Sequence, residues 1–214
     1  MERSRQAVKD TYDRIAAHFS KTREYAWPEI ESFLDSQQRV HTALDVGCGN
    51  GRHTELLAGR ADQAIGLDVS TGLLHEARKR ATEREFEADF VAGDAASLPF
   101  THDSITLAVY VATLHHLPER ELRQASLNEL ARVLTSGSRA LVSAWSTAHD
   151  SFDHEGDEGF DTMVDWTLPG GETVPRFYHI YAPAEFEADL AASNLRVEQT
   201  EISSGNCYAV VTPE

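Results

Sequence analysis

Apolar and polar positions alternate along this chain with two different periods. Between residues 5 and 35, apolar side chains stand three or four positions apart, at Val8, Tyr12, Ile15, Ala16 and Phe19. This is the spacing of an amphipathic helix, and Pro28 predicts the start of a second helix that runs to Leu34. We expect these two helices to form an arm ahead of the main fold.

Short, continuous apolar runs follow, and they predict strands at residues 43–46, 64–68, 90–94, 105–111 and 139–144. The segments between them predict helices through Leu56 and Leu57, from Ser70 or Thr71 to about Arg84, and from Glu119 to Leu134. Apolar strands that alternate with helices imply a buried parallel sheet with helices on both faces. The predicted fold class is therefore α/β.

The pattern changes after Trp145. Residues 149–165 carry seven acidic side chains and no lysine or arginine, which predicts a solvated acidic loop or lid. Beyond it, residues 183–190 predict a helix, and residues 195–201 and 208–212 predict a closing pair of strands. A chain of 214 residues with 41% hydrophobic composition fits one domain. We expect it to comprise a helical arm (1–38), a cofactor-binding half (39–145), the acidic insertion (146–173) and a C-terminal half (174–214).

Three strand ends carry residues suited to a nucleoside ligand. The first strand runs through Asp45 into the turn Gly47-Cys48-Gly49-Asn50-Gly51, where residues without a Cβ let the backbone approach a ligand closely. The second strand ends in Asp68, whose carboxylate can accept both hydrogens of a ribose diol. The third ends in Asp94, which would face an adenine amino group, with the Ala95 amide near a ring nitrogen. Open α/β sheets bind ligands at the carboxyl ends of neighbouring strands.

The glycine turn has two possible ligands, a dinucleotide or S-adenosylmethionine. Dinucleotide sites usually read Gly-x-Gly-x-x-Gly, whereas here the third glycine, Gly51, comes one residue early. A second strand-end acid, Asp94, is placed for the base and also favours S-adenosylmethionine. Tyr12 and Arg23 would close over its aminoacyl tail, with simple packing of the helical arm as the alternative. The predicted cofactor-binding residues are Tyr12, Arg23, Asp45, Gly47, Cys48, Gly49, Asn50, Gly51, Asp68, Val69, Asp94, Ala95 and Val111.

The charge distribution is uneven. The formal net charge is −16, and residues 140–214 hold 14 acidic but only two basic side chains. Such a chain repels nucleic acid at low salt, since phosphate contacts depend on lysine and arginine. At molar salt the screening length falls to about 3 Å, and long-range repulsion nearly vanishes. We therefore expect a salt-loving source in which acidic surface serves solubility, with an acidic cytosolic protein as the alternative.

Other features point to the cytoplasm. No run of about 18 apolar residues is present for a membrane span, and the first residues lead into no signal-type apolar stretch. Two cysteines are too few for a disulfide framework or a metal cluster. We expect no metal at His115 and His116 either, because neighbours on a strand point in opposite directions and no third ligand is evident.

The glycine turn, Asp68 and Asp94 together resemble the class I S-adenosylmethionine-dependent methyltransferases. That resemblance implies a Rossmann-like, seven-stranded, mostly parallel sheet in the order 3-2-1-4-5-7-6. Within this class the chain resembles the tRNA wobble-uridine carboxymethyl methyltransferases, over residues 8–145 and 174–212. The motifs that carry this resemblance are residues 12–23 with Trp27-Pro28, Leu114-His115-His116-Leu117, Arg176-Phe177-Tyr178-His179 and Gly205-Asn206-Cys207-Tyr208. Residues 135–138 depart from the family's pattern of proline and paired glycines, and residues 146–173 match no known pattern.

The family resemblance implies that the acceptor is a carboxylate on a modified uridine of tRNA and that the product is its methyl ester. An ionised carboxylate needs no general base, so the protein must align it with the methyl group and exclude water. Among the catalytic candidates, Arg176 would grip the carboxylate, His116 or His179 would orient it or the ring, and Tyr178 would stack on a base. Each has a structural alternative: the histidines could fill the rim, and Arg176 could pair with one of many local acids.

The resemblance also implies a small zinc-binding activator protein as partner. The third strand would lie at the edge of the sheet, so that the segment from Phe86 to Gly93 presents unpaired backbone groups for a partner to cover. A protected edge on a monomer is the alternative. Two further functions stay open: a small-molecule methyltransferase whose acidic lid encloses a neutral or cationic acceptor, and a cofactor-binding partner subunit with little catalysis of its own.

Overall fold

The computed structural model describes residues 4–152 and 156–214. Its first elements are α1 (Arg5–Thr22), α2 (Pro28–Asp35), β1 (Val40–Val46), α3 (Arg52–Ala58), β2 (Ala61–Asp68), α4 (Thr71–Arg84), β3 (Asp89–Ala92) and β4 (Ile105–Val111). The 3-10 turn η1 (Leu114–His116), α5 (Arg120–Val133), β5 (Leu134–Trp145), β6 (Phe160–Thr167), β7 (Thr173–Ile180), α6 (Pro183–Ala191), β8 (Leu195–Ser203) and β9 (Asn206–Pro213) follow. None of the helices in the described ranges has the length and hydrophobicity needed to traverse a lipid bilayer.

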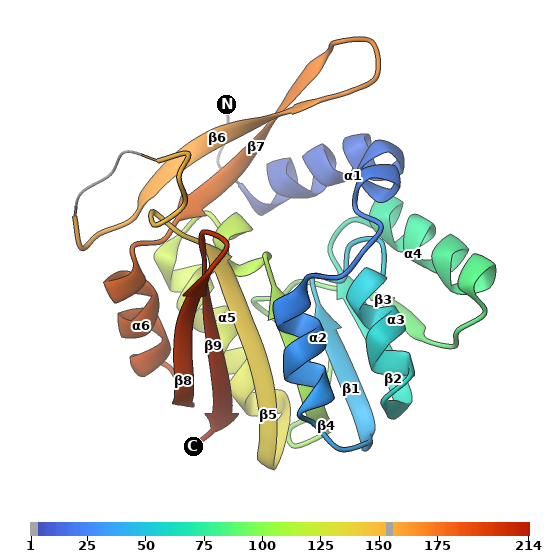
Figure 1. Cartoon of the computed structure of the whole chain (residues 1–214), viewed down its shortest axis with the longest axis vertical. Coiled ribbons are helices and arrows are strands. Elements are labelled where there is room, and N and C mark those ends of the chain that lie inside the picture. The colour runs from blue at the N-terminus through green and yellow to red at the C-terminus, as the bar shows by residue number, and fades with distance from the viewer. Residues whose placement is uncertain (1–3, 153–155) are drawn as a thin grey trace.

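Seven strands form the central sheet, in the order β3-β2-β1-β4-β5-β9-β8 (Figure 1). The first five are parallel to one another, and β9 runs antiparallel to both β5 and β8. Counted among the strands of this sheet alone, the order is 3-2-1-4-5-7-6, which confirms the predicted fold. The labels differ because β6 and β7 form a separate two-stranded sheet.

Helices cover both faces of the central sheet (Figure 1). On one face, Ile30, Phe33 and Leu34 of α2 pack with Leu57 of α3 in one buried cluster. On the other face, α5 and α6 contribute Leu127, Leu130, Phe186 and Leu190 to the largest cluster. The helix α1 packs against α4, and its Tyr12, Ile15 and Ala16 share a buried cluster with Leu73. The chain thus begins with two helices, α1 packed against α4 and α2 packed beside α3.

Capping residues set the predicted helix starts. The Ser4 hydroxyl accepts a hydrogen bond from the Ala7 amide at the start of α1, and the Ser70 hydroxyl accepts one from the Leu73 amide at the start of α4. Pro28 occupies the first position of α2, where its missing amide hydrogen costs nothing. The strands β2 and β5 begin earlier than the apolar runs predicted. The first residues of each strand include exposed polar positions, which an apolar run does not contain.

The hairpin of β6 and β7 corrects one expectation. We expected a solvated loop over residues 149–165, but from Phe160 onward this segment is a strand paired with β7; residues 153–155 of the expected lid lie outside the described residues. The hairpin crosses above α1 (Figure 1), and the Trp166 indole N–H donates to His18 Nδ1 at 3.0 Å. An ion pair between Arg14 and Glu172 joins its far end to α1. The acidic side chains of β6 lie on the exposed face of the hairpin. Because we weighed their number and not their alternation, we predicted a loop where the structure has a strand.

Candidate active site

A cavity of about 540 Å³ lies at the carboxyl ends of the central strands, and residues of α1 and of β7 also line it. It gathers residues from both halves of the chain. The predicted residues that line it are Tyr12, Arg23, Gly47, Cys48, Gly49, Asn50, Asp68, Val69, Asp94, Ala95, Val111, His116, Arg176 and Tyr178. Asp45, Gly51 and His179 are not among its lining residues.

The glycine turn forms the floor of the cavity and is held from two sides. The Gly47 and Cys48 amides both donate to the carbonyl of Leu67, at 2.7 and 2.9 Å. Gly47 has a φ of +71°, and a Cβ there would lie 2.1 Å from the Thr113 hydroxyl oxygen, so only glycine fits. At Gly49, in contrast, a Cβ would meet only the Phe19 ring within 4 Å, because this backbone faces the cavity.

Asp68 stands beside the turn with its carboxylate held in place by the backbone. One oxygen accepts from the Gly49 amide and the other from the Ser70 amide, each at 2.8 Å. Burial raises the pKa of Asp68 to about 6, although these amide bonds favour the charged form. Each oxygen keeps a free lone pair, which suits the hydroxyls of a ribose. Asp94 is more exposed: it forms an ion pair with Arg5 and accepts from the Ala96 amide at 2.9 Å.

Two predicted cofactor-binding residues, Asp45 and Gly51, lie outside the lining of the cavity. Asp45 accepts a hydrogen bond from the Thr54 hydroxyl at 2.7 Å, and burial raises its pKa to about 7. Gly51 precedes α3 with a φ of +78°, and a Cβ there would press on Ala77 and Phe90. Neither residue faces the cavity, so the structure gives both a supporting position.

The helical arm is tied to the turn and closes one side of the cavity. The Asn50 side chain donates to the carbonyls of Arg23 at 2.9 Å and Ser20 at 3.3 Å, at the end of α1. Earlier in α1, the Tyr12 hydroxyl lies 2.8 Å from His116 Nε2. These contacts fix Tyr12 and Arg23 at the edge of the cavity, which both residues line.

His116 is held as a neutral ring. Its Nδ1 lies 2.9 Å from the Phe177 carbonyl, which only accepts hydrogen bonds, so Nδ1 carries the proton and Nε2 accepts from Tyr12. Burial lowers the pKa of His116 to about 3. His115 and His116 lie in η1 and not on a strand as we expected, with ring centroids 4.4 Å apart.

His115, Tyr178 and Trp145 complete the wall around His116, and of these Trp145 was assigned no site role from the sequence. His115 is buried, and its Nδ1 accepts from the Trp145 amide at 2.9 Å, which leaves the proton on Nε2. The Tyr178 ring lies 4.8 Å from the His115 ring and 5.3 Å from the Trp145 ring. Trp145 ends β5, and its position at a strand end was the available signal.

Arg176 enters the cavity from β7 without a counter-charge. Only 7% of the residue is exposed, and its Nη1 donates to the Tyr178 hydroxyl at 2.6 Å. Its guanidinium lies 4.8 Å from the Trp166 ring centre and 5.1 Å from that of Tyr178. Its Nε has no hydrogen-bond partner, and no carboxylate among the described residues forms an ion pair with it. The expected alternative, pairing with a local acid, is therefore not observed in this part of the chain.

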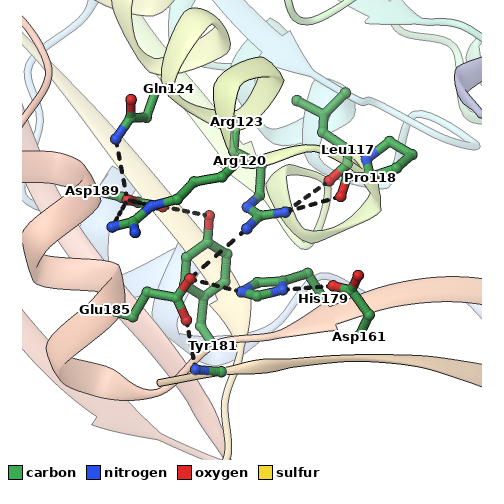
Figure 2. A network of polar contacts seen from close by, with 11 residues as sticks. Leu117, Pro118, Arg120, Arg123, Gln124, Asp161, His179, Tyr181, Glu185 and Asp189 are labelled. Carbon is green, nitrogen blue, oxygen red and sulfur yellow. Dashed lines mark hydrogen bonds and ion pairs between the residues drawn. The ribbon is translucent and has the colours of Figure 1, made fainter. Parts of the chain in front are cut away.

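The structure does not bring His179 to the cavity. Neighbours in a strand point to opposite faces, so His179 cannot share the face of Tyr178. Its Nδ1 lies 2.9 Å from Asp161 and its Nε2 lies 3.0 Å from Glu185, as Figure 2 shows. Arg123 extends this network (Figure 2), because it lies 3.8 Å from Glu185 and donates to the Leu117 carbonyl that follows η1. His179 thus joins the hairpin to α5 and α6.

Within residues 4–152 and 156–214, no group of three or more His, Cys, Asp or Glu side chains is arranged to hold a metal ion.

The chain is similar in sequence to known methyltransferases. The family described as a methyltransferase domain matches residues 43–137. The tRNA (carboxymethyluridine(34)-5-O)-methyltransferase of Saccharomyces cerevisiae is 32% identical over 179 residues, which are 82% of this chain and 61% of that protein. Its counterpart alkbh8 of Xenopus tropicalis is 41% identical over 142 residues, 66% of this chain and 21% of that protein. A putative methyltransferase of Encephalitozoon cuniculi is 33% identical over 79% of this chain and 78% of its own length. The chain thus spans less than two thirds of the yeast and frog proteins.

Solved structures share the fold. The DhpI–SAH complex superposes with a TM-score of 0.74 at 20% identity, over 97% of this chain and 96% of that one. A complex between the Haloferax volcanii Trm112 methyltransferase activator and a putative methyltransferase gives a TM-score of 0.70 at 17% identity, over 96% of this chain and 97% of that one.

Proposed function

This chain belongs to the class I S-adenosylmethionine-dependent methyltransferases, and we propose that it methylates a carboxylate on a modified wobble uridine of tRNA, forming a methyl ester. The names of its yeast and frog relatives support this acceptor. The observation that carries the proposal is Arg176, a buried cation that lines the cavity and lacks a carboxylate partner in the described chain. A buried guanidinium is costly unless an anion meets it, and the acceptor carboxylate is such an anion.

The residues of the cavity fit the cofactor. S-adenosylmethionine, when bound, supplies an electrophilic methyl group on its sulfonium. Asp68 offers carboxylate lone pairs for the ribose hydroxyls, and Asp94 offers an acceptor for the adenine amino group. The open space beside Gly49 leaves room for the aminoacyl tail, with Tyr12 and Arg23 among the residues that line the same cavity.

The remaining residues bind and orient the acceptor in this proposal. The acceptor carboxylate is ionised at neutral pH, so no side chain has to remove a proton. His116 suits such a reaction, because its low pKa keeps it neutral and its ring holds Tyr12 in place. Arg176 donates to the carboxylate, while Trp145 and Tyr178 exclude water and offer faces for the uracil ring. His179 positions β7 and does not contact the acceptor.

We propose an activator subunit as partner, docked on β3 and the helix before it. β3 is short and lies at the edge of the sheet, with one side of its backbone unpaired in the sheet. Phe90 turns inward, where it packs beside Gly66, so the backbone of the segment and Phe86 are the parts open to a partner. The similar fold in the Haloferax volcanii complex with the Trm112 activator supports this partner class.

We also infer a cytoplasmic protein adapted to high salt. A tRNA-modifying enzyme works in the compartment where tRNA is used. With a net charge of −16, this protein repels RNA unless salt screens the repulsion.

The test of the proposed function is methyl transfer from labelled S-adenosylmethionine to bulk tRNA in molar KCl, with and without the activator. A methyl ester is cleaved by mild alkali, so we expect label in tRNA that alkali releases as methanol. Label that resists alkali would exclude a carboxylate acceptor. Label found only in small metabolites would instead favour a small-molecule methyltransferase, and no label in any fraction would favour a partner subunit.

A further inference from the structure

The cavity contains more positive charge than the proposed reaction uses. Besides Arg176, both Arg23 and Arg52 line it, and neither forms an ion pair with a carboxylate among the described residues. The acids on its walls already have partners: Arg5 for Asp94, the hydroxyls of Ser203 and Ser204 for Glu29, and two backbone amides for Asp68. Three unpaired arginines in one cavity are unexpected in a chain with a net charge of −16.

Arg52 lies in a part of this cavity that also holds other unpartnered groups. Its guanidinium lies 5.2 Å from the Trp27 ring centre, and its Nη1 donates to the Tyr25 carbonyl at 3.3 Å. Burial lowers the pKa of Arg52 to about 10, so it stays charged at neutral pH. His53 Nε2 and the Tyr208 hydroxyl are buried and have no hydrogen-bond partner, although both residues line the cavity at 5% and 1% exposure.

Unpartnered buried polar groups are rare because each loses its bonds to water without replacement. Tyr208 and Arg52 can donate hydrogen bonds, and His53 can donate from Nε2 in one tautomer. A fixed cation with neutral donors around it is the arrangement that suits a phosphate or carboxylate oxygen.

We propose that Arg52, His53 and Tyr208 form an anion subsite that receives a phosphate of the RNA strand next to the acceptor nucleoside. This inference rests on the proposed function. The cofactor brings one carboxylate, which Arg23 is placed to meet, and the acceptor brings a second, which Arg176 is placed to meet. Arg52 remains for a third anionic group, and an RNA strand carries a phosphate on each side of every nucleoside. The subsite gives the enzyme a means to select a nucleotide within a strand over a free nucleoside.

The first experiment compares two acceptors, free 5-carboxymethyluridine and an anticodon stem-loop that contains it, with wild-type protein and Arg52→Gln in complex with the activator. We expect Arg52→Gln to raise KM for the stem-loop about tenfold, as the loss of one charged hydrogen bond predicts, and to change KM for the nucleoside far less. The matched control is Arg60→Gln, because Arg60 pairs with Asp35 and does not line the cavity. Equal losses with both acceptors would overturn the proposal.

The second experiment separates the phosphate from the cofactor carboxylate as the anion bound. Calorimetry measures the affinity of wild type, Arg52→Gln and Tyr208→Phe for S-adenosylhomocysteine. We expect less than a twofold change, and a tenfold loss in Arg52→Gln would overturn the proposal by assigning Arg52 to the cofactor. Tyr208→Phe removes a hydroxyl without a partner, so its melting temperature should not fall while its KM for the stem-loop rises about threefold.

A third experiment does not depend on the acceptor. Inorganic phosphate is titrated at low ionic strength into the protein saturated with S-adenosylhomocysteine. We expect wild type and Arg60→Gln to bind phosphate and Arg52→Gln not to bind it. If wild type binds phosphate but methylates no RNA, the subsite stands and the proposed function fails. If wild type binds no phosphate, the subsite is overturned whatever the acceptor is.

Discussion

Replacing Arg176 with methionine separates a binding role from a structural one. In the folded protein the guanidinium has one hydrogen bond to a neutral hydroxyl and two aromatic contacts, from Trp166 and Tyr178. Their loss costs about 1 kcal/mol for the hydrogen bond and about 1 kcal/mol for each ring contact. The substitution also relieves the burial of an unpaired cation, which costs several kcal/mol. These contributions oppose one another, so we expect Arg176→Met to change the melting temperature by no more than about 3 °C.

The effect on catalysis should be far larger. Removing one partner of a buried, hydrogen-bonded charge pair costs about 2 to 4 kcal/mol, which corresponds to a fall of about 30- to 1000-fold in kcat/KM. The assay is initial-rate transfer of labelled methyl to the anticodon stem-loop, with calorimetric binding of S-adenosylhomocysteine as the control, and that binding should not change. Arg176→Lys should recover part of the rate, since it restores the charge but not the paired donors. A loss below threefold, or a fall in melting temperature of about 10 °C with weaker cofactor binding, would refute an acceptor role for Arg176.

Three other perturbations test the fold and the charge. Gly47→Ala should destabilise the protein by about 3 kcal/mol in urea unfolding, because its Cβ would clash with Thr113 at a residue with positive φ. The control Gly137→Ala also has a positive φ but nothing within 4 Å of its Cβ, so it should cost only about 1 kcal/mol. Equal costs for the two variants would contradict this. Because burial raises the pKa of Asp45 from 3.8 to about 7, the folded state holds this proton more tightly, so the contribution of Asp45 to stability falls as pH rises from about 4 to 7. Asp45→Asn should therefore gain stability relative to wild type across that range, a comparison in which the buried histidines cancel, and a constant difference would count against it. The melting temperature should rise with KCl up to molar concentration as repulsion among the acidic side chains is screened, and a fall would end the high-salt hypothesis.

The sequence determined the central fold and the floor of the site. Apolar strands that alternate with amphipathic helices leave few topologies open, because crossovers between parallel strands are right-handed and neighbours in sequence pair in space. The strand ends at Gly47, Asp68 and Asp94 then had to meet, since the carboxyl ends of parallel strands share one edge of the sheet. The fold and the floor of the site thus follow from local periodicities and from general rules of how strands connect, and a single sequence is enough to apply both.

The tertiary structure decided which residues form the wall of the site that faces the acceptor. The hairpin was concealed because its exposed face carries the acids, while Trp166 and Arg176 share the opposite face through pairing between β6 and β7. A period of two from residue 161 to 166 was the signal that could have revealed it, and the same period separates Tyr178 from His179. The pairing of His115 with Trp145, and the corner that brings Arg52 next to Tyr208, depend on residues distant in the chain. Such contacts follow from how elements pack against one another, which no local pattern encodes.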